Sequence, residues 1–153
     1  MVLSAQTIRV ELGSRIRPFA ERTVENGMTY GLSCAGYDLR IKDSVILQPG
    51  GFELVTTIER FDFPDDILGK LADKSSWARR GVAVQNTVFE PGWRGFPTLE
   101  VSNHGSAVVS ILAGSPIAQM VFHRLDAPTD QPYGDGKYQD QPQVPVPTQP
   151  EGK

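Results

Sequence analysis

The fold is decided by residues 37–58, which read YDLRIKDSVILQPGGFELVTTI. Polar and apolar residues alternate over Tyr37–Lys42 and again over Ser44–Leu47, until Pro49-Gly50-Gly51 interrupts the pattern. The next run, Phe52–Ile58, is rich in β-branched residues. Because successive side chains of a strand point to opposite faces, this alternation predicts short strands joined by a proline-glycine turn.

The same pattern recurs toward the C-terminus, where turn residues separate further short apolar runs. The chain contains 15 glycines and 12 prolines, a content that favours many short strands over a helical bundle. The predicted class is all-β, a distorted jelly roll or β-sandwich. The further expected strands are residues 67–72, 82–84, 98–101, 107–112 and 117–123.

The two ends of the chain differ from the middle. Thr7–Leu12 alternates and is expected as a strand, although the rest of the first 32 residues is weakly patterned. One short helix is predicted, over Ser75–Arg80, with Ser75 or Ser76 as its N-cap. Prolines are frequent after Ala127, and proline cannot donate to a sheet ladder. We therefore expect a β domain of residues 1–127 and a proline-rich arm or lid of residues 128–153.

Composition limits the classes of partner. The chain has 153 residues, a net charge of -3 and a mean hydropathy of -0.26, which suit one globular domain. An acidic chain is not expected to bind duplex nucleic acid, and no apolar run is long enough to predict a membrane span. The arginine-containing start lacks an apolar signal-peptide core, so a cytoplasmic location is expected. The single cysteine, Cys34, can form neither an internal disulfide nor a thiolate metal cage.

Several common catalytic motifs are absent from the sequence. It contains no phosphate-binding P-loop, no Gly-x-Ser-x-Gly elbow and no zinc-deaminase signature. His104 and His123 follow no zinc-ligand spacing and are interpreted as a turn residue and a strand-end residue.

A first candidate site is residues 73–81, DKSSWARRG. A lysine, two hydroxyls, a helix start and an arginine at close spacing could hold a polyphosphate. The same residues also suit an ordinary capped surface helix with charged flanks. The segment alone does not decide between these interpretations.

A second candidate site is residues 87–100, TVFEPGWRGFPTLE. It places Glu90 at a turn and Glu100 between the apolar residues Leu99 and Val101. Glu100 either points to solvent from a half-exposed strand or is buried for a purpose, in which case it would suit proton transfer near neutral pH. Both interpretations stay open from these residues alone.

Taken together, the motifs resemble the dCTP deaminase branch of the dUTPase superfamily, including its bifunctional dCTP deaminase/dUTPase type. The resemblance covers roughly residues 33–142. Its segments occur in the family's order: residues 35–40 (AGYDLR), 47–52 (LQPGGF), 74–81 (KSSWARRG), 91–95 (PGWRG), 98–100 (TLE), 114–119 (GSPIAQ), 132–134 (PYG) and 137–141 (KYQDQ).

The resemblance implies a homotrimer of dUTPase-type β subunits with active sites at subunit interfaces. It implies that dCTP is deaminated to dUTP without zinc, and that Mg2+ is held mainly by the triphosphate and water. Glu100 matches the catalytic glutamate, with Ser75 and Arg79 expected to orient groups and stabilise charge. Glu90 stands where the family has an aspartate near the deoxyribose. The remaining expected substrate contacts are Lys74, Ser76, Trp77, Ala78, Thr98, Leu99, Gln119, Tyr133, Lys137 and Gln141.

One segment departs from the family's pattern. Between Gly81 and Pro91 the chain has two residues fewer than typical deaminases, and residues 87–90 replace the usual Thr-Ala-x-x-Ile-Asp. Three functions therefore remain: a dCTP deaminase, which in a bifunctional member continues to dUMP and diphosphate; a dUTPase alone; or a trimeric nucleotide-binding regulator without turnover. Glutamate at position 100 favours deamination, because a plain dUTPase would use an aspartate-activated water.

Overall fold

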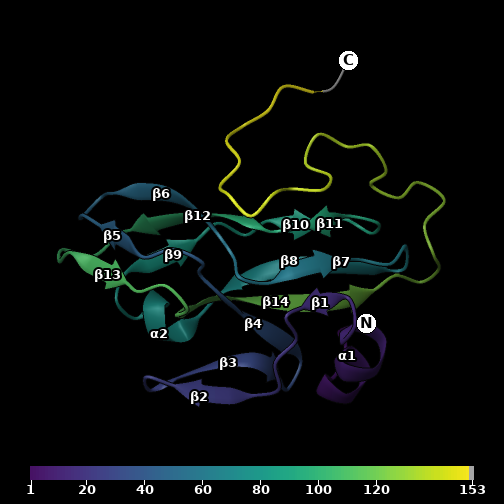
Figure 1. Ribbon diagram of the computed structural model, residues 1–153, viewed down its shortest axis with the longest axis horizontal. Helices are drawn as coiled ribbons and strands as arrows, with labels where there is room; N and C mark the ends of the chain where they lie inside the picture. The colour runs from purple at the N-terminus through teal and green to yellow at the C-terminus, as the bar shows by residue number, and fades with distance from the viewer. Residues whose placement is uncertain (152–153) are drawn as a thin grey trace.

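The structure is a computed structural model that describes residues 1–151, and Figure 1 shows its strands stacked in layers with α1 and α2 toward opposite ends. The predicted all-β class is confirmed. Within residues 1–151, no helix is long and apolar enough to cross a membrane. In chain order the elements are α1 (Ala5–Leu12), β1 (Ile16–Arg17), β2 (Thr23–Glu25), β3 (Met28–Ser33), β4 (Gly36–Arg40), β5 (Val45–Leu47), β6 (Phe52–Thr56), β7 (Arg60–Asp62), β8 (Ile67–Asp73), α2 (Ser75–Ala78), β9 (Val82–Val84), β10 (Val88–Phe89), β11 (Arg94–Gly95), β12 (Thr98–Asn103), β13 (Val109–Ile111) and β14 (Pro116–Arg124).

The largest sheet has the strand order β10-β8-β14-β4-β3-β2. β14 lies between β8 and β4 and is antiparallel to both, with Gln119 opposite Ala72 on one side and Asp38 on the other. Met120 and Phe122 of β14 are buried in the hydrophobic core. The expected strands at residues 67–72 and 117–123 are confirmed, each within a residue or two.

A second sheet, β6-β12-β9, carries the strand with the predicted catalytic glutamate. β12 is antiparallel to both neighbours, with Glu100 opposite Leu54 of β6. Leu99 and Val101 are fully buried, and both sheets contribute to a single hydrophobic core. Because side chains alternate along a strand, Glu100 must point to the face away from this core.

The N-terminal region differs from the prediction. Residues 5–12 form the helix α1 instead of the expected strand, so the described part of the chain, residues 1–151, has two short helices and not one. Ile8 and Leu12, four residues apart, are both buried. The same apolar residues satisfy strand alternation and a helical face, and packing on the core selects the helix. The weakly patterned residues that follow contribute β1, β2 and β3.

Residues 128–151, here called the C-terminal arm, form no helix or strand. In Figure 1 the arm is the yellow chain that passes over β10, β11 and β12. Its backbone is tied to β11 by hydrogen bonds from Asp140 N to Arg94 O and from Phe96 N to Gln141 O, at 2.9 and 3.0 Å. An ion pair between Arg94 and Asp140 adds a side-chain contact and lowers the pKa of Asp140 through the hydrogen bond that Arg94 donates. The arm therefore forms part of the surface above β12.

Candidate functional site

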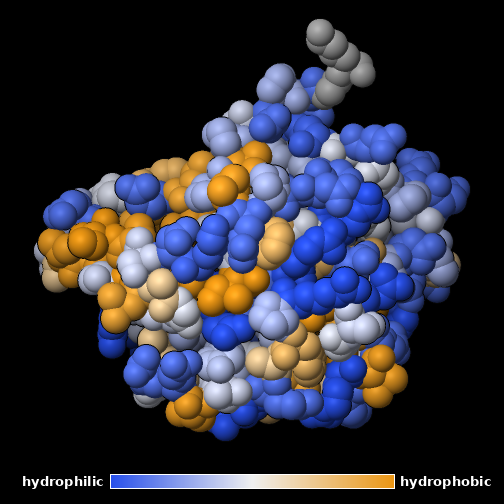
Figure 2. All heavy atoms as spheres, in the orientation of Figure 1, coloured by the Kyte–Doolittle hydropathy of each residue, from blue (hydrophilic) through white to orange (hydrophobic). Residues whose placement is uncertain are grey.

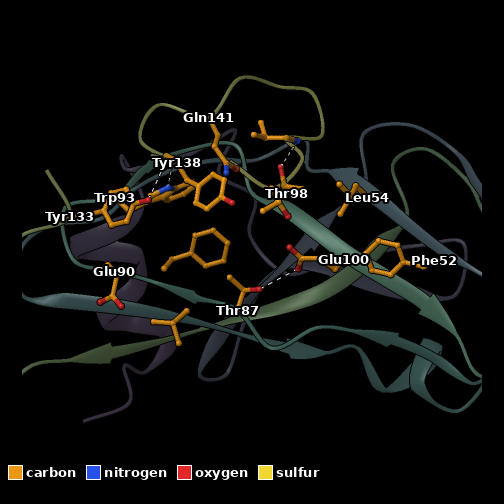
Figure 3. A pocket seen from close by; sticks show the side chains of 14 residues that line it. Phe52, Leu54, Thr87, Glu90, Trp93, Thr98, Glu100, Tyr133, Tyr138 and Gln141 are labelled. Atoms are coloured by element: carbon orange, nitrogen blue, oxygen red, sulfur yellow. Dashed lines mark hydrogen bonds between the residues drawn. The ribbon is translucent and has the colours of Figure 1, made fainter. Parts of the chain in front are cut away.

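Glu100 lies in a cavity of about 300 Å³, here called the glutamate cavity. Figure 3 shows its carboxylate pointing into the space between β12 and the arm, well separated from Glu90. The side chain is half-buried, so neither the fully exposed nor the fully buried interpretation describes it. The lining residues are Phe52, Leu54, Thr87, Val88, Phe89, Glu90, Trp93, Thr98, Glu100, Tyr133, Tyr138, Gln141, Val146 and Thr148.

The Glu100 carboxylate has one hydrogen-bond partner within residues 1–151. The Thr87 hydroxyl donates to Oε2 at 3.3 Å, and no lysine or arginine in this part of the chain forms an ion pair with the carboxylate. Leu54 and Phe52 supply apolar walls beside it. A carboxylate with one free oxygen, facing a space of ligand size, can take up and return a proton.

The arm supplies the opposite wall of the glutamate cavity. The Trp93 indole donates to Tyr138 O at 2.7 Å, and the Tyr138 amide donates to the Tyr133 hydroxyl at 3.0 Å. Gln141 Oε1 is buried, and no group within residues 1–151 donates a hydrogen bond to it. An amide oxygen without a donor is costly when buried, so Gln141 is suited to accept a hydrogen bond from a bound ligand.

A second, polar cavity of about 320 Å³ contains Lys74 and is here called the lysine cavity. Lys74 Nζ lies 2.8 Å from Asp38 Oδ2, and both side chains are almost fully buried. Gln119 Nε2 donates to Asp38 Oδ1 at 3.1 Å and to Ser33 Oγ at 3.0 Å. Lys74 is therefore neutralised by Asp38 in this conformation and is not the free cation that the sequence suggested. The lining residues are Thr29, Ser33, Asp38, Asp73, Lys74, Ser75 and Gln119.

The segment from Ser75 to Arg79 forms α2 and its end, but its N-cap is Lys74 and not a serine. Neither cap side chain is hydrogen-bonded to the helix. Trp77 is buried and its indole donates to Pro116 O at 2.6 Å, so its side chain serves packing and does not reach either cavity. Ser76, Ala78 and Arg79 line neither cavity, and the last two are exposed.

The predicted site residues thus fall into separate groups. Glu90, Thr98, Glu100, Tyr133 and Gln141 line the glutamate cavity, whereas Lys74, Ser75 and Gln119 line the lysine cavity. The two cavities share no lining residue, so one chain does not bring Ser75 or Arg79 to Glu100. Leu99 lies in the core, and only its main chain could touch a ligand.

Lys137 lines neither cavity and is paired within the arm. Its Nζ lies 2.5 Å from a carboxylate oxygen of Glu151, and the hydrogen bond it donates raises the pKa of Lys137. This lysine is partly exposed, so an anionic ligand could exchange with Glu151.

The sequence did not assign roles to Thr87, Phe52, Leu54, Trp93 and Tyr138, which also line the glutamate cavity. Four of them, all but Leu54, lie in segments that the sequence had already singled out, which was the available signal. Leu54 had none, because its position beside Glu100 comes from the pairing of β6 with β12.

Within residues 1–151, no group of three or more His, Cys, Asp or Glu side chains is arranged to hold a metal ion. The lysine cavity offers two carboxylates, but Asp38 is engaged by Lys74 and Asp73 accepts the Val84 amide at 2.7 Å. Both carboxylates of the lysine cavity are therefore already engaged by protein groups.

Comparison with known proteins finds relatives that cover most of this chain. A sequence model of the family described as dCTP deaminase-like matches residues 37–125. The dCTP deaminase of Acidobacterium capsulatum is 35% identical over 168 aligned residues, covering 89% of this chain and 92% of that protein. The dCTP deaminase of Campylobacter fetus is also 35% identical, covering 86% of this chain and 88% of that protein.

Solved structures show the same fold at lower identity. The 2'-deoxycytidine 5'-triphosphate deaminase of Agrobacterium tumefaciens matches with a TM-score of 0.67 at 18% identity, covering 80% of this chain and 47% of that chain. The EIAV dUTPase matches with a TM-score of 0.60 at 18% identity, covering 80% of this chain and 98% of that one. The predicted dUTPase-type fold is therefore confirmed, and the chain belongs to the dCTP deaminase-like family.

Proposed function

We propose that the chain deaminates dCTP to dUTP, consuming one water and releasing ammonia. The observation that carries this proposal is the Glu100 carboxylate, which faces a cavity with one oxygen that has no hydrogen-bond partner among residues 1–151. A hydrolytic deamination needs a group that accepts a proton from water and returns protons to the base and to the leaving amine.

In this proposal Glu100 carries out the proton transfer. Its free oxygen accepts a proton from the attacking water as the water oxygen bonds to C4 of cytosine, and this proton passes to N3. A second proton moves from the new hydroxyl to the exocyclic nitrogen, the C4–N bond breaks, and ammonia leaves as the C4 carbonyl forms. Apolar walls from Phe52 and Leu54 lower the local dielectric and so strengthen these electrostatic interactions.

The site is proposed to be completed by a neighbouring subunit in a homotrimer. Glu100 and Ser75 line different cavities of one chain and Arg79 lines neither, and a partner copy could place its Ser75–Arg79 segment opposite Glu100. Figure 2 shows hydrophobic side chains gathered at the end of the molecule that holds β5, β6 and β13. Exposed Ile46, Phe52 and Leu112 lie there, and such a patch suits a subunit contact.

The triphosphate is proposed to bind with Mg2+, which would offset its negative charge and orient it. Ser75 and Arg79 would contact the phosphates and the base from the partner side. The two lysines expected to bind the triphosphate are already paired, Lys74 with Asp38 and Lys137 with Glu151. A cation bound to the ligand itself is therefore needed to offset the negative charge of the phosphates. A cytoplasmic location stays a prediction.

A second candidate, hydrolysis of dUTP to dUMP and diphosphate, is favoured by one observation. Gln119 and Asp38 meet in the polar lysine cavity, where the carboxylate could accept a hydrogen bond from an attacking water. This activity could follow deamination in the same protein or replace it. A regulator that binds nucleotide without turnover is the remaining alternative.

Product analysis separates these functions. Purified protein is incubated with dCTP or dUTP and Mg2+, and nucleotides are resolved by chromatography. Formation of dUTP from dCTP supports deamination alone, and dUMP from both substrates supports the bifunctional reaction. If dUMP forms only from dUTP, the protein is a dUTPase, and saturable binding without any product indicates a regulator.

Complementation tests the shared site. The Glu100→Gln and Arg79→Ala variants should each be inactive alone, whereas coexpressed copies should recover part of the activity because some interfaces contain both native residues. Failure of the mixed oligomers to regain any activity would contradict a site shared between subunits.

A further inference from the structure

We propose that Thr87 is a positioning residue for Glu100, holding one carboxylate oxygen so that the other faces the substrate. This inference rests on the proposed deaminase function and extends it to a residue outside the motif-matched set. Its basis is a single contact, the hydrogen bond from Thr87 Oγ1 to Glu100 Oε2 at 3.3 Å, which is drawn in Figure 3.

Thr87 is the one hydrogen-bonding neighbour of the carboxylate in the part of the chain that the structure describes. A glutamate side chain has several rotatable bonds, and neither the apolar Leu54 nor Phe52 can orient its oxygens. A proton-transfer group acts efficiently only when its reacting oxygen lies within hydrogen-bond reach of the proton. The threonine hydroxyl therefore selects which oxygen stays available.

The backbone holds Thr87 in place from two sides. Gln85 N donates to the Glu100 carbonyl at 3.0 Å, which joins the end of β9 to the glutamate's own strand. Leu71 N donates to the Thr87 carbonyl at 3.0 Å, which joins the same short segment to β8. With an anchor at each end, the segment brings the hydroxyl to the carboxylate before any ligand binds.

The residue type suits this role. Threonine is β-branched, so its χ1 angle is restricted and the hydroxyl direction is well defined. Its hydroxyl carries one proton, so it donates a hydrogen bond to one carboxylate oxygen and leaves the other to accept a proton from water. Valine has nearly the same shape without the hydroxyl, and serine keeps the hydroxyl without the methyl group.

The test compares Thr87→Val and Thr87→Ser with the unaltered full chain, using kcat for dCTP deamination and the dissociation constant of dCTP. Thr87→Val should lower kcat by roughly 10- to 100-fold, the range for one hydrogen bond to a charged group, with little change in dCTP binding. Thr87→Ser should recover most of the lost rate. Thr23→Val on β2, which removes a threonine hydroxyl away from both cavities, is the control.

A coupling measurement shows whether the effect acts through the carboxylate. In a Glu100→Asp background the shorter side chain cannot reach Thr87, so adding Thr87→Val should lower kcat much less than in the unaltered chain. A gel-filtration profile and thermal unfolding curve for each variant exclude a folding defect.

The outcomes distinguish this inference from the proposed function. If the unaltered protein does not deaminate dCTP, both fail. If it does, but Thr87→Val keeps a normal kcat, weakens only dCTP binding, or is not rescued by serine, the positioning role is overturned and the proposed function stands.

Discussion

Gly95 and Gln141 pair in a parallel bridge, and the two backbones approach too closely for a side chain between them. A Cβ atom added to Gly95 would lie 2.6 Å from the Gln141 backbone nitrogen. Gly95 also has a φ of 145°, a conformation that residues with a Cβ rarely adopt. This glycine therefore permits the arm to dock on β11 and to form one wall of the glutamate cavity.

Replacing Gly95 with alanine should displace the arm. We expect KM for dCTP to rise by about tenfold, as after the loss of one or two hydrogen bonds, while the β domain stays folded. Steady-state kinetics and a thermal unfolding curve measure the two effects. Gly50→Ala is the matched control, because Gly50 has a φ of 74° but no heavy atom within 4 Å of an added Cβ. If Gly95→Ala binds dCTP normally, the arm does not contribute to the site.

Replacing Glu100 with glutamine removes the proton acceptor and retains the shape of the side chain. We expect kcat for deamination to fall by about 10²- to 10⁴-fold, the usual effect of losing a general acid-base group, with dCTP binding retained. Calorimetric titration and product chromatography measure binding and turnover. Glu53→Gln, an exposed glutamate on the neighbouring β6, is the control and should leave both unchanged. Near-normal turnover in Glu100→Gln would remove this residue from catalysis.

Lys74 should matter first for stability. Its ion pair with Asp38 is almost fully buried, so Lys74→Ala leaves an unpaired carboxylate and should lower the free energy of unfolding by about 3 kcal/mol. The double variant with Asp38→Ala should recover part of this loss. Denaturant unfolding measures both, with Lys70→Ala, an exposed lysine on the preceding strand β8, as control. If Lys74→Ala is as stable as the unaltered chain but binds dCTP weakly, the lysine acts as a phosphate cation.

Chelators should distinguish a requirement for Mg2+ from a requirement for zinc. EDTA should suppress turnover of dCTP until Mg2+ is added back, because the triphosphate needs a cation to bind on an acidic protein. A zinc-selective chelator should leave turnover unchanged. Activity assays with each chelator, and with Mg2+ restored in excess, measure this. Full turnover in excess EDTA would contradict the magnesium proposal, and loss of turnover with the zinc chelator would contradict a zinc-free reaction.

The β-strand pattern could be predicted where one face is buried. At β8 and β14 the apolar residues recur at the spacing of a pleated strand, and the structure places those residues in the core. The pattern was misleading at α1, where Ile8 and Leu12 fit both a strand and a helix. β7 and β11 were missed because each is a very short strand beside a turn, with no room for a periodic signal.

Part of the candidate site was also predictable. Glu100 was singled out as a charged residue within an apolar strand, and the structure places it in a cavity. The ion pair between Lys74 and Asp38 could not be foreseen, because Lys74 directly follows β8 and Asp38 lies on β4, and the two meet only when β14 brings these strands together. The burial of Trp77 could not be foreseen either, because its indole donates a hydrogen bond to Pro116, which lies far from it in the sequence.

The sequence by itself determined the all-β class, the family and the identity of the central carboxylate, because these depend on residue types and on spacings along one strand or turn. Only the tertiary structure decided that Glu100 faces the arm, that Thr87 reaches its carboxylate, and that Ser75 lines a different cavity while Arg79 lines neither. These relationships join residues through strand pairing and packing, and the direction of a side chain in space is set by all the elements around it.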